Sequence, residues 1–272
     1  MTNTENPLPN PIPPTGYGVD MARRFGGVSR LYGAAGLTKL QAAHIVVVGI
    51  GGVGSWAAEA LARNAVGRIT LVDLDHIAES NVNRQIHALD GHFGKAKITA
   101  MAKRIRQINP DCVVREIEDF VTVDNASKML NFQFDCLVDC IDDAAAKAVL
   151  AAICKAVNSP IIMSGSAGGR LDPTRIKVAD LSLVTNDKLL AKVRNLLRRD
   201  YQFPKASNTK KSAKSDVTCV YSDEPIIKPN NVCESDSTSI TGLNCAGYGS
   251  SVCVTAPMGF AAAQLAINLI IA

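Results

Sequence analysis

The chain has 272 residues, 47% of them hydrophobic and 20% charged, which excludes wholesale disorder, a collagen-like repeat and a coiled coil. Twenty-nine Lys and Arg against 25 Asp and Glu leave a net charge of +4, which permits a nucleic-acid partner without arguing for one. The eight cysteines are too sparse for a secreted disulfide scaffold. No two of them form a CxxC pair, so we expect no structural zinc.

The first 20 residues have neither the apolar core nor the basic lead of a signal peptide, and five prolines fall between Pro7 and Pro14. We therefore predict a disordered, proline-rich tail over 1–20 and a cytoplasmic protein. The remaining residues, 21–272, are the right length for a single domain.

Strands and helices alternate along the first part of this domain. Unalternated β-branched runs predict strands buried on both faces, and helical periodicity fills the intervals. In chain order we expect helix 21–40 with a break at Gly26-Gly27, strand 44–49, helix 53–64, strand 68–73, helix 95–108, strand 112–117, helix 124–130, strand 134–139, helix 144–157 and strand 160–165. The alternation predicts an α/β fold with a Rossmann-like, mostly parallel sheet flanked by helices.

The alternation breaks at Ile176. A strand (176–181), a basic amphipathic helix (187–199) and a strand (217–222) follow. We therefore divide the domain into a nucleotide-binding part, about 41–170, and an elaborated C-terminal half on the substrate side, about 171–272.

Residues 252–272 contain no charge, and hydropathy alone would flag a membrane span. Thr255, Gln264 and Asn268 interrupt the apolar run. We interpret it as a buried core or dimer-interface helix with Pro257 in its first turn, and membrane association is the alternative.

A glycine loop follows the first predicted strand. Gly49, Gly51, Gly52 and Gly54 satisfy the GxGxxG pattern, which permits a tight turn and a close backbone approach to phosphate at a helix N-terminus. Asp73 ends the next strand, where an acid can accept hydrogen bonds from ribose hydroxyls. The pattern indicates a nucleotide site, for which NAD is the usual ligand. A purely structural glycine turn is the alternative.

Two basic residues lie on the segment that follows the second strand at the same edge of the predicted sheet. The strand end at Asp73 and Asp75 is followed by Asn83, Arg84 and Lys97. Two cations beside a phosphate loop suit ATP better than NAD, because a triphosphate has more negative charge to compensate. The alternatives are a surface ion pair of Arg84 with one of the aspartates and a solvated position for Lys97.

A further strand brings Asp139, Asp142 and Asp143 to that edge. Mg²⁺ is held by one or two carboxylates together with substrate phosphates, and Asp142 is our candidate for contacting the metal or the nucleotide. The alternative is a helix cap, which we favour for Asp143.

Together these motifs resemble the ubiquitin-activating-like adenylating family of the ThiF, MoeB and HesA type. The shared motifs are GxGGVGS (49–55), LARNAVG (61–67), the acidic strand end, NRQ (83–85), Lys97, INP (108–110) and DxxD (139–142). The resemblance implies that the enzyme joins a carboxylate to the α-phosphate of ATP. It also implies that ATP and its Mg²⁺ are bound by Gly51, Asp73, Arg84, Lys97 and Asp142.

A closer resemblance, over nearly the whole chain, is to the branch of this family that dehydrates threonylcarbamoyladenosine in tRNA. The shared motifs are RFGG (24–27), RLYG (30–33), NRQIHAL (83–89), GSAGGRLDP (165–173), the helix at 187–199 and NCAGYG (244–249). It implies a homodimer that binds tRNA and cyclises this nucleoside through an acyl-adenylate of its threonyl carboxylate.

Other functions stay open at this stage. One is an activator that adenylates the C-terminal carboxylate of a small ubiquitin-like sulfur-carrier protein, with a sulfur-transfer protein as partner. Such members usually have two CxxC pairs, which this chain lacks. An NAD(P)-dependent oxidoreductase and a non-catalytic nucleotide-binding scaffold are the alternatives from other classes.

Catalysis and tRNA binding have their own candidate residues. Arg84 and Lys97 would stabilise charge on the phosphates. Cys245 lies in a glycine-rich stretch and is either a nucleophile or a lining residue. We predict that a basic cluster binds the phosphate backbone of tRNA; it includes Arg194, Arg198, Arg199, Lys210 and Lys211. The alternative is that these residues lie on a solvated helix and loop with no partner.

Overall fold

The computed structural model describes residues 19–205, 214–227 and 248–272. The described strands are β1 (His44–Val48), β2 (Arg68–Val72), β3 (Val113–Ile117), β4 (Cys136–Asp139), β5 (Ile161–Ser164), β6 (Ile176–Asp180) and β7 (Thr218–Ser222). The α-helices are α1 (Met21–Ala42), α2 (Gly54–Arg63), α3 (Lys97–Ile108), α4 (Ala126–Met129), α5 (Ala144–Ala156), α6 (Lys188–Asp200) and α7 (Val252–Ile271). Short 3-10 turns are η1 (Glu79–Asn81), η2 (Pro173–Arg175) and η3 (Leu181–Leu183). All but the last two residues of the predicted tail over 1–20 lie outside the described residues.

The strands form one sheet in the order β3-β2-β1-β4-β5-β7-β6. All neighbouring pairs are parallel except β6 and β7, which are antiparallel. This confirms the predicted Rossmann-like, mostly parallel sheet, and the change of direction falls where the alternation of strands and helices breaks.

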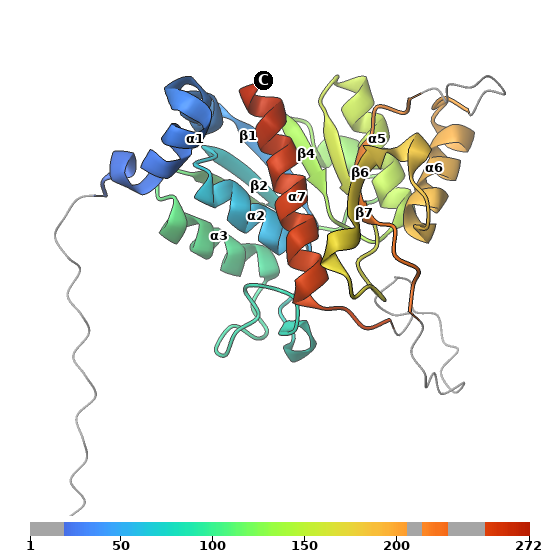
Figure 1. The fold of residues 1–272 in the computed structure, drawn as a ribbon, viewed down its shortest axis with the longest axis horizontal. Helices are drawn as coiled ribbons and strands as arrows, with labels where there is room; N and C mark the ends of the chain where they lie inside the picture. Colours follow the sequence, from blue (N-terminus) through green and yellow to red (C-terminus); the bar gives the residue numbers. More distant parts are fainter. Residues whose placement is uncertain (1–18, 206–213, 228–247) are drawn as a thin grey trace, which may run out of the picture.

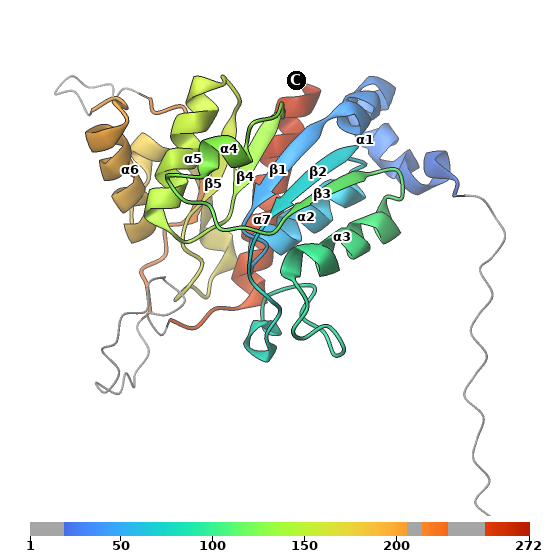
Figure 2. The same cartoon turned by 180° about the vertical axis from the view of Figure 1, so that it is seen from behind.

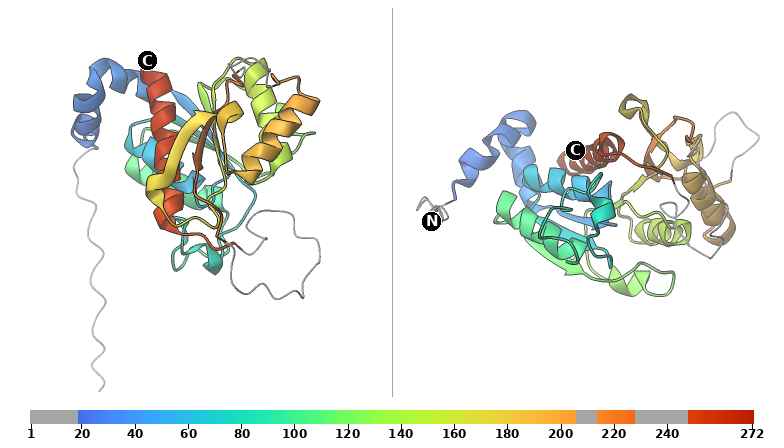
Figure 3. Two further views of the ribbon diagram at one scale, coloured as in Figure 1. Left: turned by 45° about the vertical axis from the view of Figure 1, so that its right-hand side comes forward. Right: turned by 90° about the horizontal axis from the view of Figure 1, so that it is seen from below.

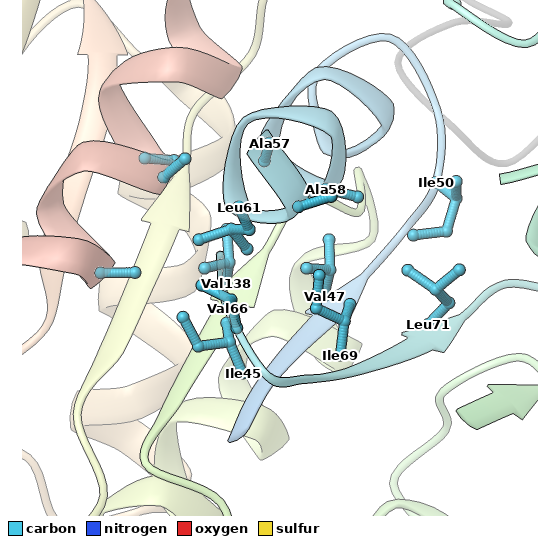
Figure 4. Close-up of a cluster of buried hydrophobic side chains, with 14 of the residues drawn as sticks. Ile45, Val47, Ile50, Ala57, Ala58, Leu61, Val66, Ile69, Leu71 and Val138 are labelled. Atoms are coloured by element: carbon cyan, nitrogen blue, oxygen red, sulfur yellow. The ribbon is translucent and has the colours of Figure 1, made fainter. Parts of the chain in front are cut away.

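Helices cover both faces of the sheet (Figures 1 and 2). One face packs against α1, α2, α3 and α7, and the other against α4, α5 and α6. Viewed from below, the two helix layers lie on opposite sides of the strands (Figure 3). On the first face, Ala57 and Leu61 of α2 pack onto Ile45, Val47 and Ile69 of the sheet (Figure 4). Burial on both faces explains why residues 45–48 of β1 are an unbroken apolar run and why β2 is apolar at Ile69, Leu71 and Val72.

The break predicted in the first helix is misplaced. Helix α1 continues through Gly26-Gly27 and is interrupted at Gly33, where φ is 77° and ψ is 164°. This combination of φ and ψ is adopted almost only by glycine, whereas Gly26 and Gly27 keep helical geometry. A glycine pair in a sequence shows where a helix can bend, and packing decides whether it does.

The last helix starts earlier than predicted. Helix α7 has 20 residues and begins at Val252, so Pro257 lies beyond its first turn. Proline removes the hydrogen bond to the carbonyl four residues earlier, which belongs to the exposed Cys253, where water can replace it. Helix α7 is long and apolar enough to cross a membrane, but half of its most apolar stretch of 18 residues is buried in this fold. The segment is therefore a packed helix, as interpreted from the sequence.

Candidate functional site

A cavity of about 550 Å³ opens beside the carboxyl ends of β1, β2, β4 and β5. Its volume is typical of a small-molecule site. In open parallel sheets ligands bind at this edge, where the strand order reverses. Here the reversal lies between β1 and β4.

The glycine loop forms one wall of the cavity. Gly49, Gly51 and Gly52 line it, whereas Gly54 starts α2 behind it. Gly49 has a φ of +84°. A Cβ on Gly54 would lie 1.8 Å from the carbonyl oxygen of Gly49, so only glycine lets the helix begin this close to the strand. The motif thus positions a helix N-terminus next to the cavity.

Asp73 fixes the shape of this loop. Its Oδ2 accepts a hydrogen bond from the Ile50 N–H at 2.6 Å, and its Oδ1 accepts one from the Asp75 N–H at 2.8 Å. Burial raises the pKa of the Asp73 carboxyl, and the charge of Lys97 opposes that shift. Each carboxylate oxygen has a further lone pair for a ligand hydroxyl.

Arg84 and Lys97 both line the cavity. The Lys97 side chain is only 7% exposed, and its Nζ lies 2.7 Å from Asp75 Oδ2. The Arg84 Nη1 donates to the Ser80 carbonyl and to Asn83 Oδ1 rather than pairing with Asp73 or Asp75. The structure therefore contradicts the alternatives of a solvated Lys97 and of an Arg84–aspartate ion pair.

Asn83 is not among the lining residues. Its Nδ2 donates to the Ser250 carbonyl and so ties the β2–α3 connection to the start of α7 (Figure 1). The buried Asn81 and Gln85 line the cavity instead, together with Thr255 of α7. Gln85 belongs to the NRQ motif, whereas Asn81 precedes it, and the turn in which the Gln85 N–H donates to the Asn81 carbonyl places the two together.

Two buried polar atoms at this wall have no partner. Within the described part of the chain, Gln85 Oε1 and Thr255 Oγ1 make no hydrogen bond. Buried polar atoms normally have a partner, so these two are available to a bound ligand. No signal in the sequence pointed to Thr255, because its position depends on the packing of α7.

The acidic residues after β4 have different surroundings. Asp142 is exposed and lines the cavity. Asp143 lines it too, and its Oδ1 accepts the Ala146 N–H at 2.7 Å, which is the predicted cap of α5. Asp139 is fully buried and paired with Lys147 of α5, whose Nζ lies 3.1 Å from Asp139 Oδ1. Burial raises the Asp139 pKa and Lys147 opposes the shift. Sequence reasoning missed Lys147.

A family model described as the ThiF family matches residues 25–271. This chain belongs to the ThiF family. Among its ThiF-family relatives, the tRNA threonylcarbamoyladenosine dehydratase of Haemophilus influenzae is 46% identical over 247 residues, 90% of this chain and 92% of that one. The enzyme of the same name from Escherichia coli is 44% identical over 256 residues, 92% of this chain and 94% of that one.

Solved structures agree with the sequence relatives. The crystal structure of the E. coli dehydratase, TcdA, in complex with ATP matches this ThiF-family fold with a TM-score of 0.82 and 43% identity, over 92% of this chain and 94% of that chain. Its complex with AMP matches with a TM-score of 0.82 over the same shares.

The arginines predicted to bind tRNA lie on α6 of this ThiF-family chain. Two are engaged by backbone carbonyls: Arg194 Nη1 donates to Leu181 and Val184, and Arg198 Nε donates to Pro204. The exposed Arg199 is paired with its neighbour Asp200. The other candidates, Lys210, Lys211 and Cys245, lie outside the described residues.

Proposed function

We propose that this protein is an ATP-dependent tRNA threonylcarbamoyladenosine dehydratase. The observation on which this depends is the match to the ATP-bound E. coli enzyme over 92% of the chain, with the phosphate loop, Arg84 and Lys97 on one cavity. The alternatives of an NAD(P)-dependent oxidoreductase and a binding scaffold have no comparable support.

The cavity walls fit the parts of ATP. Val48, Val72 and Val121 give an apolar surface for the base, and Asp73 lies where it can accept from ribose hydroxyls. The glycine loop and the start of α2 face the phosphates. The unpartnered Gln85 Oε1 and Thr255 Oγ1 offer further polar contacts at the same wall.

The reaction follows from the charges in the cavity. An oxygen of the threonyl carboxylate bonds to the α-phosphorus, and the bond to pyrophosphate breaks. Arg84 and Lys97 stabilise the negative charge that builds up on the phosphate oxygens. Asp142 is suited to hold Mg²⁺, which would neutralise further phosphate charge.

Ring closure then needs no external nucleophile. The carbamoyl oxygen lies in the same molecule as the activated carbonyl, so its attack is intramolecular. AMP leaves with the carboxylate oxygen, one proton is lost, and the net change in the nucleoside is the loss of one water. A transient thioester on Cys245 stays a prediction for this step.

A stripe of side chains on α6 fits the tRNA backbone. Lys188, Lys192 and Arg199 are exposed at helical spacing, opposite the buried Leu190 and Val193. We assign first contact with tRNA phosphates to this lysine stripe (Lys188 and Lys192), because Arg194 and Arg198 are engaged by the protein itself.

The remaining assignments are proposals of the same kind. We propose one domain over 21–272, since strands of both its nucleotide-binding part (about 41–170) and its substrate side (about 171–272) belong to one sheet. We also propose a cytoplasmic homodimer. A sulfur-transfer protein as partner, and the expected lack of structural zinc, stay predictions.

Mass spectrometry of the nucleoside tests this function. Incubation of the protein with ATP, Mg²⁺ and tRNA carrying threonylcarbamoyladenosine should remove ~18 Da from that nucleoside by the covalent balance above. Lys97→Ala should lower kcat/KM by about 100-fold, as removal of a transition-state interaction does, whereas Lys95→Ala, which changes an exposed lysine, should not. No mass change with the unmodified enzyme would sink the proposal.

A further inference from the structure

Asp187 joins two elements through one buried carboxylate. It is the N-cap of α6, and its Oδ1 accepts the Leu190 N–H at 2.9 Å. Its Oδ2 accepts the Ser166 N–H at 2.8 Å. Asp187 is 4% exposed, and Ser166 lines the large cavity. The carboxylate therefore ties the helix with the lysine stripe to a wall of the cavity.

The local geometry is built around this contact. A Cβ on Gly165 would lie 2.3 Å from Asp187 Oδ2, so a side chain there would displace the carboxylate. A second tie runs beside the first, because Arg170 Nη2 donates to the Asn186 carbonyl at 2.8 Å. Both ends of the segment 166–170 are thus fixed to the two residues that precede α6.

The tied wall lies on the substrate side of the cavity. Residues 164–168 are the last residue of β5 and the loop that follows it, on the far side of β4 from the glycine loop and Asp73. ATP would occupy the β1–β2 side, which leaves the β5 side for the group that attacks it. By contrast, Asp143, the cap of α5, has a hydrogen bond only to its own helix among the described residues.

We propose that Asp187 is a positioning residue that fixes the substrate-side wall of the cavity to the tRNA-docking helix. Docking of tRNA on α6 then sets the position of the wall against which the threonyl carboxylate lies. The meaning of this tie for catalysis rests on the proposed function, whereas the tie itself can be tested without tRNA.

Two substitutions separate the tie from the helix cap. Asn caps helices as well as Asp, but in Asp187→Asn the amide Nδ2 cannot accept from the Ser166 N–H. Asp187→Ser likewise keeps a capping oxygen and is too short to reach Ser166. Asp180→Asn is the matched control. Asp180 also caps a turn and accepts a hydrogen bond from the Ser215 N–H, but Ser215 does not line the large cavity.

Amide hydrogen exchange is the first measurement. Asp187→Asn and Asp187→Ser should speed exchange over 164–168 by about tenfold, the loss of one charge-assisted hydrogen bond, while α6 keeps its protection. Asp180→Asn should leave 164–168 unchanged. Unchanged exchange at 164–168 in both Asp187 variants, or faster exchange confined to α6, would overturn the proposal.

Kinetics test the consequence for the reaction. In both Asp187 variants kcat/KM for tRNA should fall about tenfold or more, while Kd for ATP stays within about threefold. Equal losses in ATP binding and in turnover would mean a general collapse of the cavity and overturn the positioning role. If the unsubstituted enzyme does not dehydrate tRNA, the proposed function fails, and hydrogen exchange still decides whether the tie exists.

Discussion

At the scale of single residues, His87 is an uncharged base in a positive environment. It is 1% exposed, and neither ring nitrogen has a partner in the part of the chain that the structure describes. Burial first, and then the charges of Lys97, His92 and Arg104, lower the pKa of His87 to about 4. The folded protein therefore keeps this imidazole neutral at a pH where the unfolded chain protonates it.

Acid should destabilise the fold through this residue. Because the folded pKa lies below the unfolded value of 6.5, stability falls as the pH drops from about 6.5 toward 4, and the loss is about 3 kcal/mol in full. His87→Leu should abolish this part of the pH dependence in urea unfolding at pH 7 and pH 5. The raised pKa of Asp73 has the opposite effect on stability as the pH falls. Because both proteins contain Asp73, this effect cancels when the variant is compared with the unsubstituted protein. His76→Gln, at an exposed histidine, should keep the full slope; an equal slope in the His87 variant would refute the assignment.

Part of the candidate site could be predicted from the sequence, for a physical reason. Strand ends and the loops that follow them share one edge of a parallel sheet, so Asp73, Arg84 and Lys97 could be predicted as neighbours. Lys147 and Asp187 could not, because their contacts depend on how α5 and α6 pack.

At the scale of elements, α7 crosses α2 with backbone contact. A Cβ on Gly259 would lie 2.5 Å from the Val53 carbonyl oxygen, 2.9 Å from Trp56 Cβ and 3.0 Å from the Ala57 nitrogen. Backbone atoms cannot move aside as the end of a side chain can. The two helices can therefore approach this closely only with glycine at 259.

Gly259→Ala should lower the free energy of unfolding by about 1–3 kcal/mol, the usual cost of overpacking. Helix propensity alone would raise it by about 1 kcal/mol. Gly27→Ala in α1 is the matched control, since the new Cβ would have only an Arg30 nitrogen at 4.0 Å and should be neutral or stabilising. Chemical denaturation of both variants gives the comparison, and a stabilised Gly259 variant would contradict the close crossing.

The lysine stripe on α6 should act through charge alone. The double variant Lys188→Ala/Lys192→Ala should weaken tRNA binding about tenfold at moderate salt and reduce the slope of log K against log salt by about 2, one for each phosphate that a lysine no longer neutralises. Lys103→Ala on α3, at the other end of the sheet (Figure 1), is the control. Filter binding over a salt series measures both. A lowered affinity with an unchanged salt slope would argue against phosphate contacts at these positions.

At the scale of the whole molecule, the strands and the parallel part of the sheet could be predicted, whereas the antiparallel direction of β6 and the start of α7 could not. Runs of β-branched residues without alternation predict strands that are buried on both faces. Short right-handed crossovers allow only a few orders of β1 to β5 in the sheet. The antiparallel pairing of β6 with β7 has no such local signal, because the connection between them includes α6. The start of α7 was missed for a similar reason. Helix propensity predicts that the helix begins near Pro257, but packing on α2 stabilises a helix that begins at Val252 and continues through the proline.

The apolar character of α7 leads to the last prediction. The helix contains no charged residue, although Gln264 and Asn268 lie on its exposed side. A helix with apolar residues on every side is normally buried over most of its surface. Only half of its most apolar stretch is buried within one chain, and Phe260 and Leu269 are 45% and 47% exposed. A second copy of the chain would cover them.

Light scattering should therefore give a mass of about twice 28.8 kDa, with the apolar area of α7 as the main source of affinity. Phe260→Glu should shift the protein toward the monomer, because a charge in an apolar interface loses its hydration without a partner. Val157→Glu replaces a residue that is 54% exposed after α5 and should leave the mass unchanged. A monomer at every concentration would refute the dimer, whereas a dimer that tolerates Phe260→Glu would exclude this face of α7 as its interface.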